Sequence, residues 1–145
     1  KTVNYDDTNS KHWYWSPDSG KPGTLLTYFE RDPRQTRRVQ MGIGQTHHYA
    51  LSVGSDEEQL EWRERILRAG ISVSPVRDRQ YFKSIYMQDP DGHIVEIATV
   101  PPGFTVDETV ESLGTSLKLP PFVEPMRPQI EGSLKKLNVP EWKGV

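Results

Sequence analysis

Side chains that bind metal ions in other proteins lie at the two ends of residues 45–98. The stretch opens with Gln45–Leu51, which contains His48, and closes with His93–Thr99, which contains Glu96. The composition of both ends predicts β-strands. If these strands are neighbours in a sheet, a neutral imidazole and a carboxylate converge on one point, which is the beginning of a divalent metal site.

The composition limits the chemistry open to this chain. Its 145 residues are enough for one domain with a hydrophobic core. The formal net charge is −2 and the lysines and arginines are dispersed, which argues against a nucleic-acid partner. No apolar run approaches membrane-spanning length, so we expect no membrane partner.

Cysteine is absent from the sequence. Its absence excludes disulfides, thiolate catalysis and cysteine zinc sites, and it fits the cytoplasmic location that we expect. Any metal ion must therefore be bound by His, Asp, Glu or Tyr. These ligands favour hard or borderline ions such as Fe(II), Mn(II) or Zn(II).

The first part of the chain predicts an incomplete module. Within residues 1–30 we expect three strands in a meander, at Lys1–Tyr5, Lys11–Trp15 and Gly23–Phe29. Residues 31–44 are polar and rich in arginine, and we expect them to form a linker between two modules.

Residues 45–100 predict a complete β-α-β-β-β module. Its first strand is expected at 45–53. The capping-box pair Ser55 and Glu58 marks the start of the helix, and Gly70 marks its end. The later strands are expected at Ile71–Val76, from Ser84 to Met87, and at His93–Val100.

Residues 101–145 form a tail rich in proline. We expect short helices at Asp107–Leu113 and Ile130–Leu137. The tail is predicted to wrap the domain or to reach a partner, and residues 1–145 as a whole are predicted to form a single domain.

Three further polar residues are candidates for a site, each with an ordinary alternative. His47 is adjacent to His48 on a strand, so the two should face opposite ways. Arg79 either holds a phenolate oxygen or is a solvated arginine paired with Asp78. Tyr86 either donates a hydrogen bond to bound oxygen or a substrate hydroxyl, or packs as an ordinary strand aromatic.

Two other histidines are expected to lie away from the site. His93 is three residues from Glu96, an odd separation along a strand, so it should face the opposite way, toward the surface. His12 is the remaining candidate for a third ligand within the chain, but its position beside Trp13 and Tyr14 favours a packing role.

Four motifs together resemble those of a known family. They are Gly42-x-Gly44-x-Thr46-His47-His48-x-Ala50, Asp78-Arg79-x-Tyr81-Phe82-x-Ser84-Ile85-Tyr86, Glu96-Ile97-Ala98-Thr99 and Pro102-Gly103-Phe104-x-x-Asp107-Glu108. The combination is similar to ring-cleaving dioxygenases that act on hydroquinones. These belong to the vicinal oxygen chelate superfamily, which also holds glyoxalase I and bleomycin-resistance proteins.

The resemblance implies an α+β fold of paired βαβββ modules around a mononuclear Fe(II), with Mn(II), Zn(II) or Ni(II) as alternatives. By motif position it implies that His48 and Glu96 are metal ligands. It also implies that His47, Arg79 and Tyr86 contact the substrate oxygens or the bound dioxygen. The family's remaining histidine ligand lies on the opening strand of the first module. That strand and its helix are missing from this chain, so we expect the third ligand to come from elsewhere.

Three functions follow as hypotheses. The first is an Fe(II)-dependent ring-cleaving dioxygenase, with a small hydroquinone-type aromatic and dioxygen as its partners. The second is a glyoxalase-type isomerase or lyase that uses Zn(II) or Ni(II) and consumes no oxygen. The third is a non-catalytic, resistance-type binding protein that sequesters an aromatic. We expect a homodimer in each case, because the incomplete first module exposes a sheet edge that must be covered.

Overall fold

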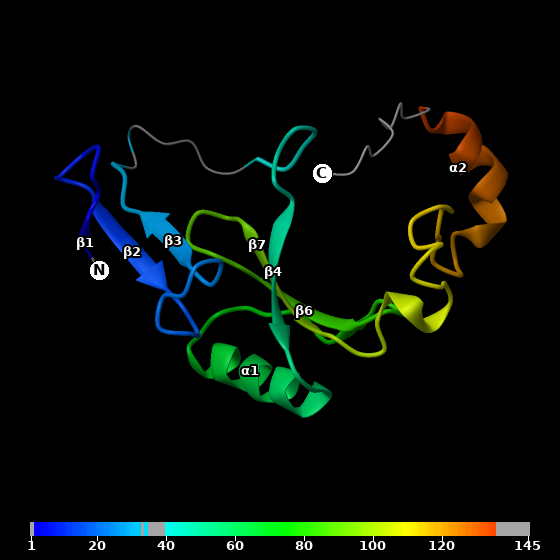
Figure 1. Cartoon of the computed structure of the whole chain (residues 1–145), viewed down its shortest axis with the longest axis horizontal. Helices are drawn as coiled ribbons and strands as arrows, with labels where there is room; N and C mark the ends of the chain where they lie inside the picture. The colour runs from blue at the N-terminus through cyan, green and yellow to red at the C-terminus, as the bar shows by residue number, and fades with distance from the viewer. Residues whose placement is uncertain (1, 33, 35–39, 136–145) are drawn as a thin grey trace. The chain divides into compact units, whose positions relative to one another are not determined.

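The structure is a computed structural model that describes residues 2–32, 34 and 40–135. The chain divides into two compact units, Lys1–Val100 and Pro101–Val145, and Figure 1 traces both by residue number. The organisation of the chain as a single domain with a linker and a tail stays a prediction.

A three-stranded antiparallel sheet opens the first unit. Its order is β1-β2-β3, with β1 at Thr2–Val3, β2 at Lys11–Trp15 and β3 at Leu26–Phe29 (Figure 1). The two faces of β2 differ as the alternation predicts, since Trp13 and Trp15 stack on one face with their ring centroids 6.1 Å apart. Within the described part of the chain, the outer edge of β3 pairs with no strand.

A four-stranded sheet and one helix complete the first unit. The sheet order is β4-β7-β6-β5, with β4 at His48–Val53, β7 at Ile94–Thr99, β6 at Lys83–Gln88 and β5 at Arg77–Asp78. Strand β4 pairs parallel with β7, the other pairs are antiparallel, and helix α1 (Asp56–Arg68) follows β4 (Figure 1). This order confirms the α+β fold with one complete βαβββ module. The β1-β2-β3 sheet matches a module without its opening strand and helix.

Helix α1 begins and ends at the predicted signals. The Ser55 hydroxyl accepts the backbone N–H of Glu58 at 3.2 Å, and the Glu58 carboxylate accepts the N–H of Gly54 at 2.7 Å. At the other end Gly70 adopts φ +76°, a left-handed conformation that glycine adopts without strain.

The hydrophobic core lies on the helix side of the four-stranded sheet. Val53, Ile85 and Ile97 are each at most 7% exposed, and they pack against Ile66 of α1. Because side chains alternate along a strand, the residues next to these core positions face away from the helix. The side chains of Ser84, Tyr86 and Glu96, described below, lie on that opposite face.

A buried glutamine joins the helix to two strands. Gln59 of α1 is 1% exposed, and its side-chain amide donates to the carbonyl oxygens of Lys83 at 2.9 Å and Ile97 at 2.8 Å. A buried amide is stable only when it is hydrogen-bonded, so Gln59 fixes α1 against β6 and β7 at one point.

The predicted strand at Ile71–Val76 is wrong. The segment runs beside β6, where the N–H of Ser74 donates to the Tyr86 carbonyl at 2.9 Å. The N–H of Tyr86, however, donates to the Ser74 hydroxyl at 3.0 Å, and Pro75 has no N–H to donate. A regular ladder therefore begins only at Arg77. The first strand of the module is also shorter than predicted, since it begins at His48.

The second unit is made of short helices and turns. Its elements are η1 (Phe104–Val106), η2 (Glu124–Met126) and α2 (Arg127–Ser133). Arg127 makes ion pairs with Glu124 at 2.6 Å and Glu131 at 2.9 Å. No helix in the part of the chain that the structure describes is long and apolar enough to cross a bilayer.

Both helices predicted in the tail differ from the structure. At Asp107–Leu113 the chain forms turns instead, because the Ser112 hydroxyl bonds both the N–H and the carbonyl of Thr109 and so competes with helical hydrogen bonds. The helix predicted at Ile130–Leu137 begins earlier, at Arg127, and ends at Ser133. Residues 136 and 137 of that prediction lie outside the described residues.

Replacing Gln59 by leucine tests this contact between helix and sheet. Gln59→Leu keeps a similar volume but leaves the carbonyls of Lys83 and Ile97 without their side-chain donor. We expect the free energy of unfolding, measured by urea denaturation, to fall by about 2–4 kcal/mol, since an unsatisfied buried acceptor costs about 1–3 kcal/mol. The control Glu61→Leu, at an exposed position of the same helix, should change it by less than about 0.5 kcal/mol. Equal losses in the two variants would contradict the role given to Gln59.

Candidate functional site

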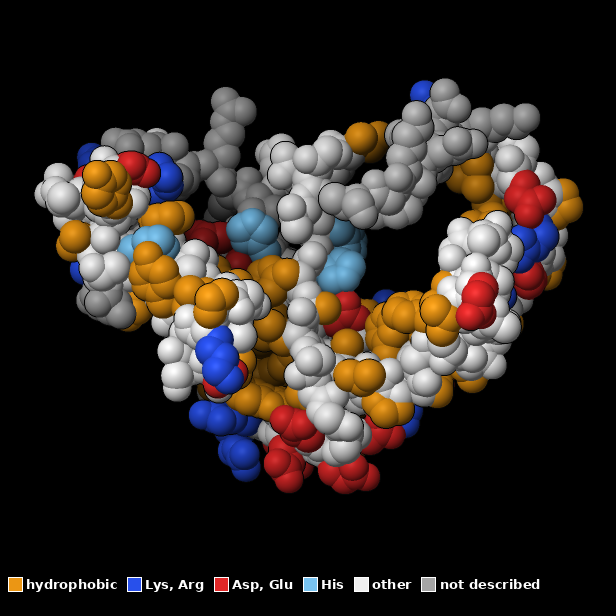
Figure 2. Space-filling model, in the orientation of Figure 1, with side chains coloured by type: hydrophobic (Ala, Val, Ile, Leu, Met, Phe, Trp, Pro, Cys, Tyr) orange, Lys and Arg blue, Asp and Glu red, His pale blue; other side chains and the backbone are white. Residues whose placement is uncertain are grey.

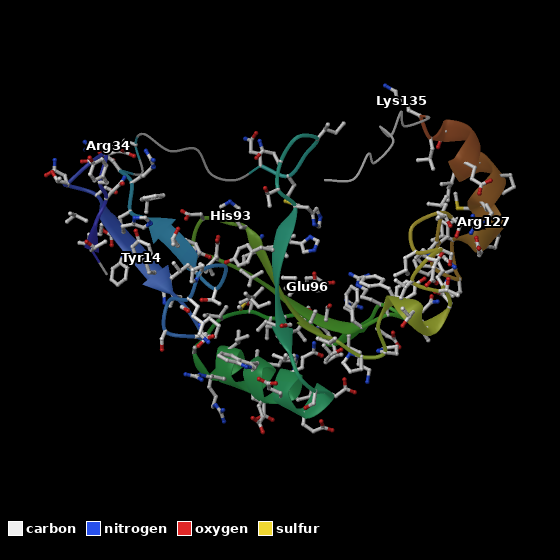
Figure 3. The ribbon with its side chains drawn as sticks, in the orientation of Figure 1. Tyr14, Arg34, His93, Glu96, Arg127 and Lys135 are labelled. Carbon is white, nitrogen blue, oxygen red and sulfur yellow. The ribbon has the colours of Figure 1, made fainter. Side chains whose placement is uncertain are left out.

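The register of three neighbouring strands brings the candidate ligands together. Ala50 of β4 and Tyr86 of β6 both lie opposite Glu96 of β7. His48 is two residues before Ala50 and so shares the face of Glu96. The His48 Nε2 atom lies 3.0 Å from Glu96 Oε2. Figure 3 labels Glu96 in the four-stranded sheet. The predicted convergence of these two side chains is therefore present in the structure.

The Glu96 carboxylate is buried and fully engaged. The residue is 3% exposed, and its Oε1 atom accepts hydrogen bonds from the hydroxyls of Ser84 and of Tyr86, the latter at 2.9 Å. Its other oxygen, Oε2, faces His48. Hydrogen bonds from two hydroxyls compensate for the water that the carboxylate loses on burial.

Arg79 is attached to the site through Tyr86. Its Nε–H donates to the Tyr86 hydroxyl oxygen at 3.1 Å, and its guanidinium carbon lies 5.4 Å from the centre of the Tyr86 ring. A directed chain of hydrogen bonds therefore runs from Arg79 through Tyr86 to Glu96. In this arrangement the proton of the Tyr86 hydroxyl goes to the carboxylate, whereas the sequence had suggested donation to a substrate or bound oxygen.

The two adjacent histidines lie side by side. Their Nδ1 atoms are 2.9 Å apart, and their rings meet edge to face with centroids 5.1 Å apart. The expectation that they face opposite ways is wrong, because His47 precedes the first residue of β4 and strand alternation does not apply to it. Figure 2 colours the histidine side chains pale blue, and some of them lie beside the upper part of β4.

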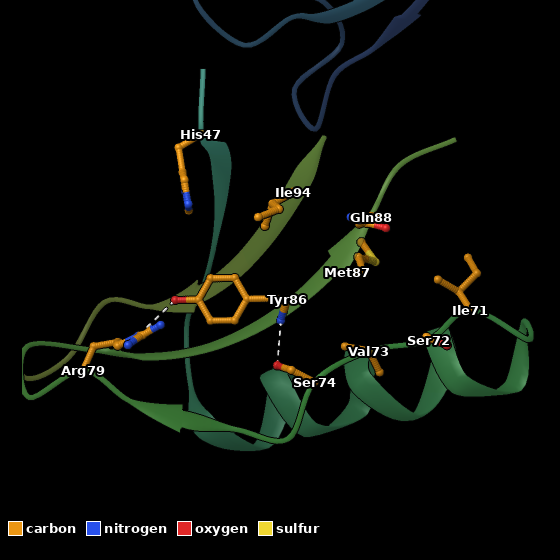
Figure 4. A pocket seen from close by; sticks show the side chains of 10 residues that line it. All are labelled: His47, Ile71, Ser72, Val73, Ser74, Arg79, Tyr86, Met87, Gln88 and Ile94. Atoms are coloured by element: carbon orange, nitrogen blue, oxygen red, sulfur yellow. Dashed lines mark hydrogen bonds between the residues drawn. The ribbon is translucent and has the colours of Figure 1, made fainter. Parts of the chain in front are cut away.

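A cavity of about 530 Å³ lies beside these residues. Figure 4 shows that His47, Arg79 and Tyr86 lie toward one side of it, and that Ile71 and Met87 lie toward the other. The remaining lining residues are Ser72, Val73, Ser74, Gln88 and Ile94. Cationic and hydrogen-bonding groups facing apolar side chains suit a small ring that carries oxygen substituents.

The other histidines have local partners. His93 precedes β7, and its Nδ1 lies 3.1 Å from the carboxylate of Asp89 in the preceding turn. His12 lies between the rings of Tyr14 and Phe29, with centroids 4.1 and 4.0 Å away. Among the described residues, no group of three or more histidine, cysteine, aspartate or glutamate side chains is arranged to hold a metal ion.

The donor set fits part of a metal site. An imidazole nitrogen and a carboxylate oxygen converge at 3.0 Å, and both are ligand types that iron(II) accepts. Because three protein ligands are usual for such a site, His48 and Glu96 would supply two of them.

Two residues of the site were missed in the sequence. Ser84 is completely buried and bonds Glu96, and Ser74 bonds the backbone of Tyr86. A signal for Ser84 was present, because it lies two residues before Tyr86 and must share its face of β6. Ser74 had no such signal, since its role depends on the irregular path of the segment beside β6.

A tyrosine pair on the helix side of β4 connects the two sheets of the first unit. The hydroxyls of Tyr28, on β3, and Tyr49, on β4, are hydrogen-bonded. Burial, and then this hydrogen bond, raise the pKa of Tyr49 above its usual value. Tyr49 therefore keeps its proton into alkaline solution, and its hydroxyl remains able to donate.

A protein-family model matches about two thirds of the chain. Residues 3–97 match the family model described as the Glyoxalase/Bleomycin resistance protein/Dioxygenase superfamily. The matched range includes helix α1, the His48–Glu96 pair and all of both sheets except Thr2 of β1 and the last two residues of β7.

Curated relatives carry names of ring-cleaving enzymes. The chain is 48% identical over 104 residues to "Putative ring-cleaving dioxygenase MhqO" of Bacillus subtilis, which covers 72% of this chain and 33% of that protein. It is 32% identical over 124 residues to "Chlorohydroquinone/hydroquinone 1,2-dioxygenase" of Sphingobium indicum, which covers 85% of this chain and 37% of that protein. The chain thus spans 33% and 37% of the length of these two relatives.

A solved structure shares the fold. The crystal structure described as a "putative dioxygenase" from Bacillus subtilis superposes with a TM-score of 0.72 at 42% identity. The superposition covers 83% of this chain and 38% of that one.

The hydrogen bonds to Glu96 predict a difference between two substitutions. Glu96→Gln keeps an oxygen that can accept from Ser84 and Tyr86, so its free energy of unfolding should stay within about 1 kcal/mol of the parent. Glu96→Leu leaves the buried Ser84 hydroxyl without its acceptor and should lower that free energy by about 1–3 kcal/mol. Urea denaturation of the metal-free proteins measures both. A leucine variant as stable as the glutamine variant would show that these bonds do not stabilise the fold.

Proposed function

Since this chain belongs to the Glyoxalase/Bleomycin resistance protein/Dioxygenase superfamily, we propose that it forms part of an Fe(II)-dependent dioxygenase that cleaves the ring of a hydroquinone-type aromatic. The observation that carries the proposal is the 3.0 Å approach of His48 Nε2 to Glu96 Oε2, beside the cavity that His47, Arg79 and Tyr86 line. The names of the Bacillus and Sphingobium relatives support the choice of reaction and substrate.

The proposed metal ion is bound by His48 and Glu96, with a third histidine from outside this chain. A comparison of the two sheets supports a third ligand from another chain. In the complete module β7 pairs on one side with β6 and on the other with β4, which carries His48. Strand β3 pairs with β2 as β7 does with β6, but in the described part of the chain its other edge is open. A strand added at that edge would be the counterpart of β4, and a second copy of the chain in a homodimer is one source of it.

The chain's own side chains bind and orient the substrate in this proposal. When bound, Fe(II) supplies adjacent positions for a substrate hydroxyl and dioxygen and passes electrons between them. The Arg79 guanidinium binds a phenolate oxygen by a charge-assisted hydrogen bond. The His47 imidazole forms a hydrogen bond with a substrate oxygen and so helps to orient the ring. The apolar side of the cavity, with Ile71 and Met87, contacts the ring.

Tyr86 orients two of these groups. Its hydroxyl donates to Glu96 and accepts from Arg79, so one side chain fixes both the carboxylate and the guanidinium. Arg79 keeps its other guanidinium nitrogens for a substrate oxygen while its Nε is engaged. Loss of the Tyr86 hydroxyl should therefore disturb substrate orientation and the ligand carboxylate together.

Metal content is the first test of this proposal. The chain is loaded anaerobically with Fe(II), desalted and examined by elemental analysis, alongside His48→Ala and Glu96→Ala. We expect about one iron per chain in the parent and less than about a tenth of that in either variant, because each removes one protein ligand. His93→Ala is the matched control, since His93 is paired with Asp89 instead, and it should retain the iron of the parent.

Oxygen consumption is the second test. Iron-loaded protein should consume dioxygen when a hydroquinone is added, and Arg79→Ala should lower kcat/KM by about 10-fold or more, since it removes a charge-assisted bond. Iron binding without oxygen uptake by any hydroquinone would exclude the dioxygenase reaction for this chain. Retention of Zn(II) or Ni(II) in place of iron would favour an isomerase of the same superfamily.

A further inference from the structure

Ser84 is the most deeply buried polar group of the site. It is 0% exposed, and its hydroxyl donates to Glu96 Oε1. Ser84 lies opposite Ala98 and Tyr86 lies opposite Glu96, so the two β6 residues share one face and reach the carboxylate from neighbouring positions. Both of their hydroxyls donate to the same carboxylate oxygen.

This arrangement makes the two oxygens of Glu96 different. The end of a glutamate side chain rotates easily, because its terminal torsion has a broad, roughly two-fold preference. With two hydroxyl donors on Oε1, rotation of the carboxylate breaks both bonds. Oε2 is thereby directed toward His48 Nε2, 3.0 Å away, and is the oxygen left for another partner.

The surroundings of Ser84 make its bond the firmer of the two. Gln59 holds the carbonyls of Lys83 and Ile97, which are the residues next to Ser84 and Glu96 in sequence. A hydrogen bond in a dry, low-dielectric interior is also stronger than one in water. Tyr86, in contrast, lines the cavity and is shared with Arg79, so its hydroxyl is open to a ligand.

We propose that Ser84 is a positioning residue for metal binding: it keeps Oε1 of Glu96 occupied so that Oε2 and His48 Nε2 form the ligand pair. The inference rests on the proposed function, because it concerns the same metal site. A serine that only stabilised the fold would change the unfolding temperature and leave the affinity and spectrum of a bound metal unchanged.

Cobalt(II) binding separates these two roles. The probe is Co(II), which gives a visible spectrum sensitive to its ligands, titrated into the metal-free 145-residue chain. We expect Ser84→Ala to raise the dissociation constant by about 10-fold or more and to alter the spectrum, as loss of groups that orient metal ligands usually does. Ser84→Thr restores a hydroxyl and should return the dissociation constant to within about 3-fold of the parent.

Ser10 offers a matched control. It is 7% exposed, and its hydroxyl donates to the backbone carbonyl of Glu30 in the first part of the chain. Ser10→Ala should therefore lower the unfolding temperature while leaving Co(II) affinity and spectrum as in the parent. Tyr86→Phe, which removes the other donor to Oε1, provides a second test if threonine is too large for the buried position. Adding Ser84→Ala to Tyr86→Phe should weaken binding further.

The outcomes separate this inference from the proposed function. Parent protein that takes up no Co(II) overturns both. Binding that is abolished by Glu96→Ala but unchanged in Ser84→Ala overturns the role of Ser84 and leaves the metal site standing. A folded Ser84→Thr variant that binds as weakly as Ser84→Ala overturns the role of the hydroxyl, and so does an unchanged affinity on adding Ser84→Ala to Tyr86→Phe.

Discussion

A carboxylate buried on the central strand of a sheet constrains the rest of this module. Glu96 is 3% exposed, and an ionised group without water is stable only if its neighbours supply hydrogen bonds. Those neighbours come from both sides of β7: Ser84 and Tyr86 from β6, and His48 from β4. A one-residue shift of either strand would turn its partners to the other face and leave the carboxylate unpaired. The hydrogen bonds of the site therefore form only when β4, β7 and β6 pair in this register.

One face of this sheet packs in the hydrophobic core, and the other carries the Tyr86 and Glu96 side chains of the site. Ile85 and Ile97 pack against α1, while Tyr86 and Glu96, next to them in sequence, form the site. Gln59 connects the two faces from the helix side, since it bonds backbone groups adjacent to Ser84 and Glu96. The site thus lies on regular strands that pack against the hydrophobic core, as groups that must hold a fixed geometry require.

Sequence reasoning predicted the features that depend on short-range rules. The capping pair of Ser55 and Glu58 follows from capping chemistry, and the approach of His48 to Glu96 follows from the two-residue period of strands. The family motifs then identified which histidine to pair with Glu96. Each of these signals lies within a few residues or on one strand.

The failures have physical causes of the same kind. The two-residue alternation of a strand was applied to His47, which precedes β4. It was also applied to Ile71–Val76, where the Ser74 hydroxyl replaces a backbone hydrogen bond of the sheet and Pro75 has no N–H to donate. Strand alternation places Ser84 on the face of Tyr86, but it does not show that the Ser84 hydroxyl reaches Glu96 on the neighbouring strand. Which hydrogen bonds the Ser74 and Ser84 hydroxyls make depends on the neighbouring strands that lie beside them in the folded sheet.

The parallel pairing of β4 with β7 has a consequence for dynamics. These are the first and last strands of the module, so the pair of His48 and Glu96 joins its two ends across the intervening helix and strands. A ligand that bridges them opposes the opening of the whole module, whereas fraying of β5 at the far edge of the sheet leaves the pair intact. Occupancy of this site is therefore expected to slow hydrogen exchange throughout the β4–β7 sheet and α1, and the protected amides would map the cooperative unit to which the site belongs.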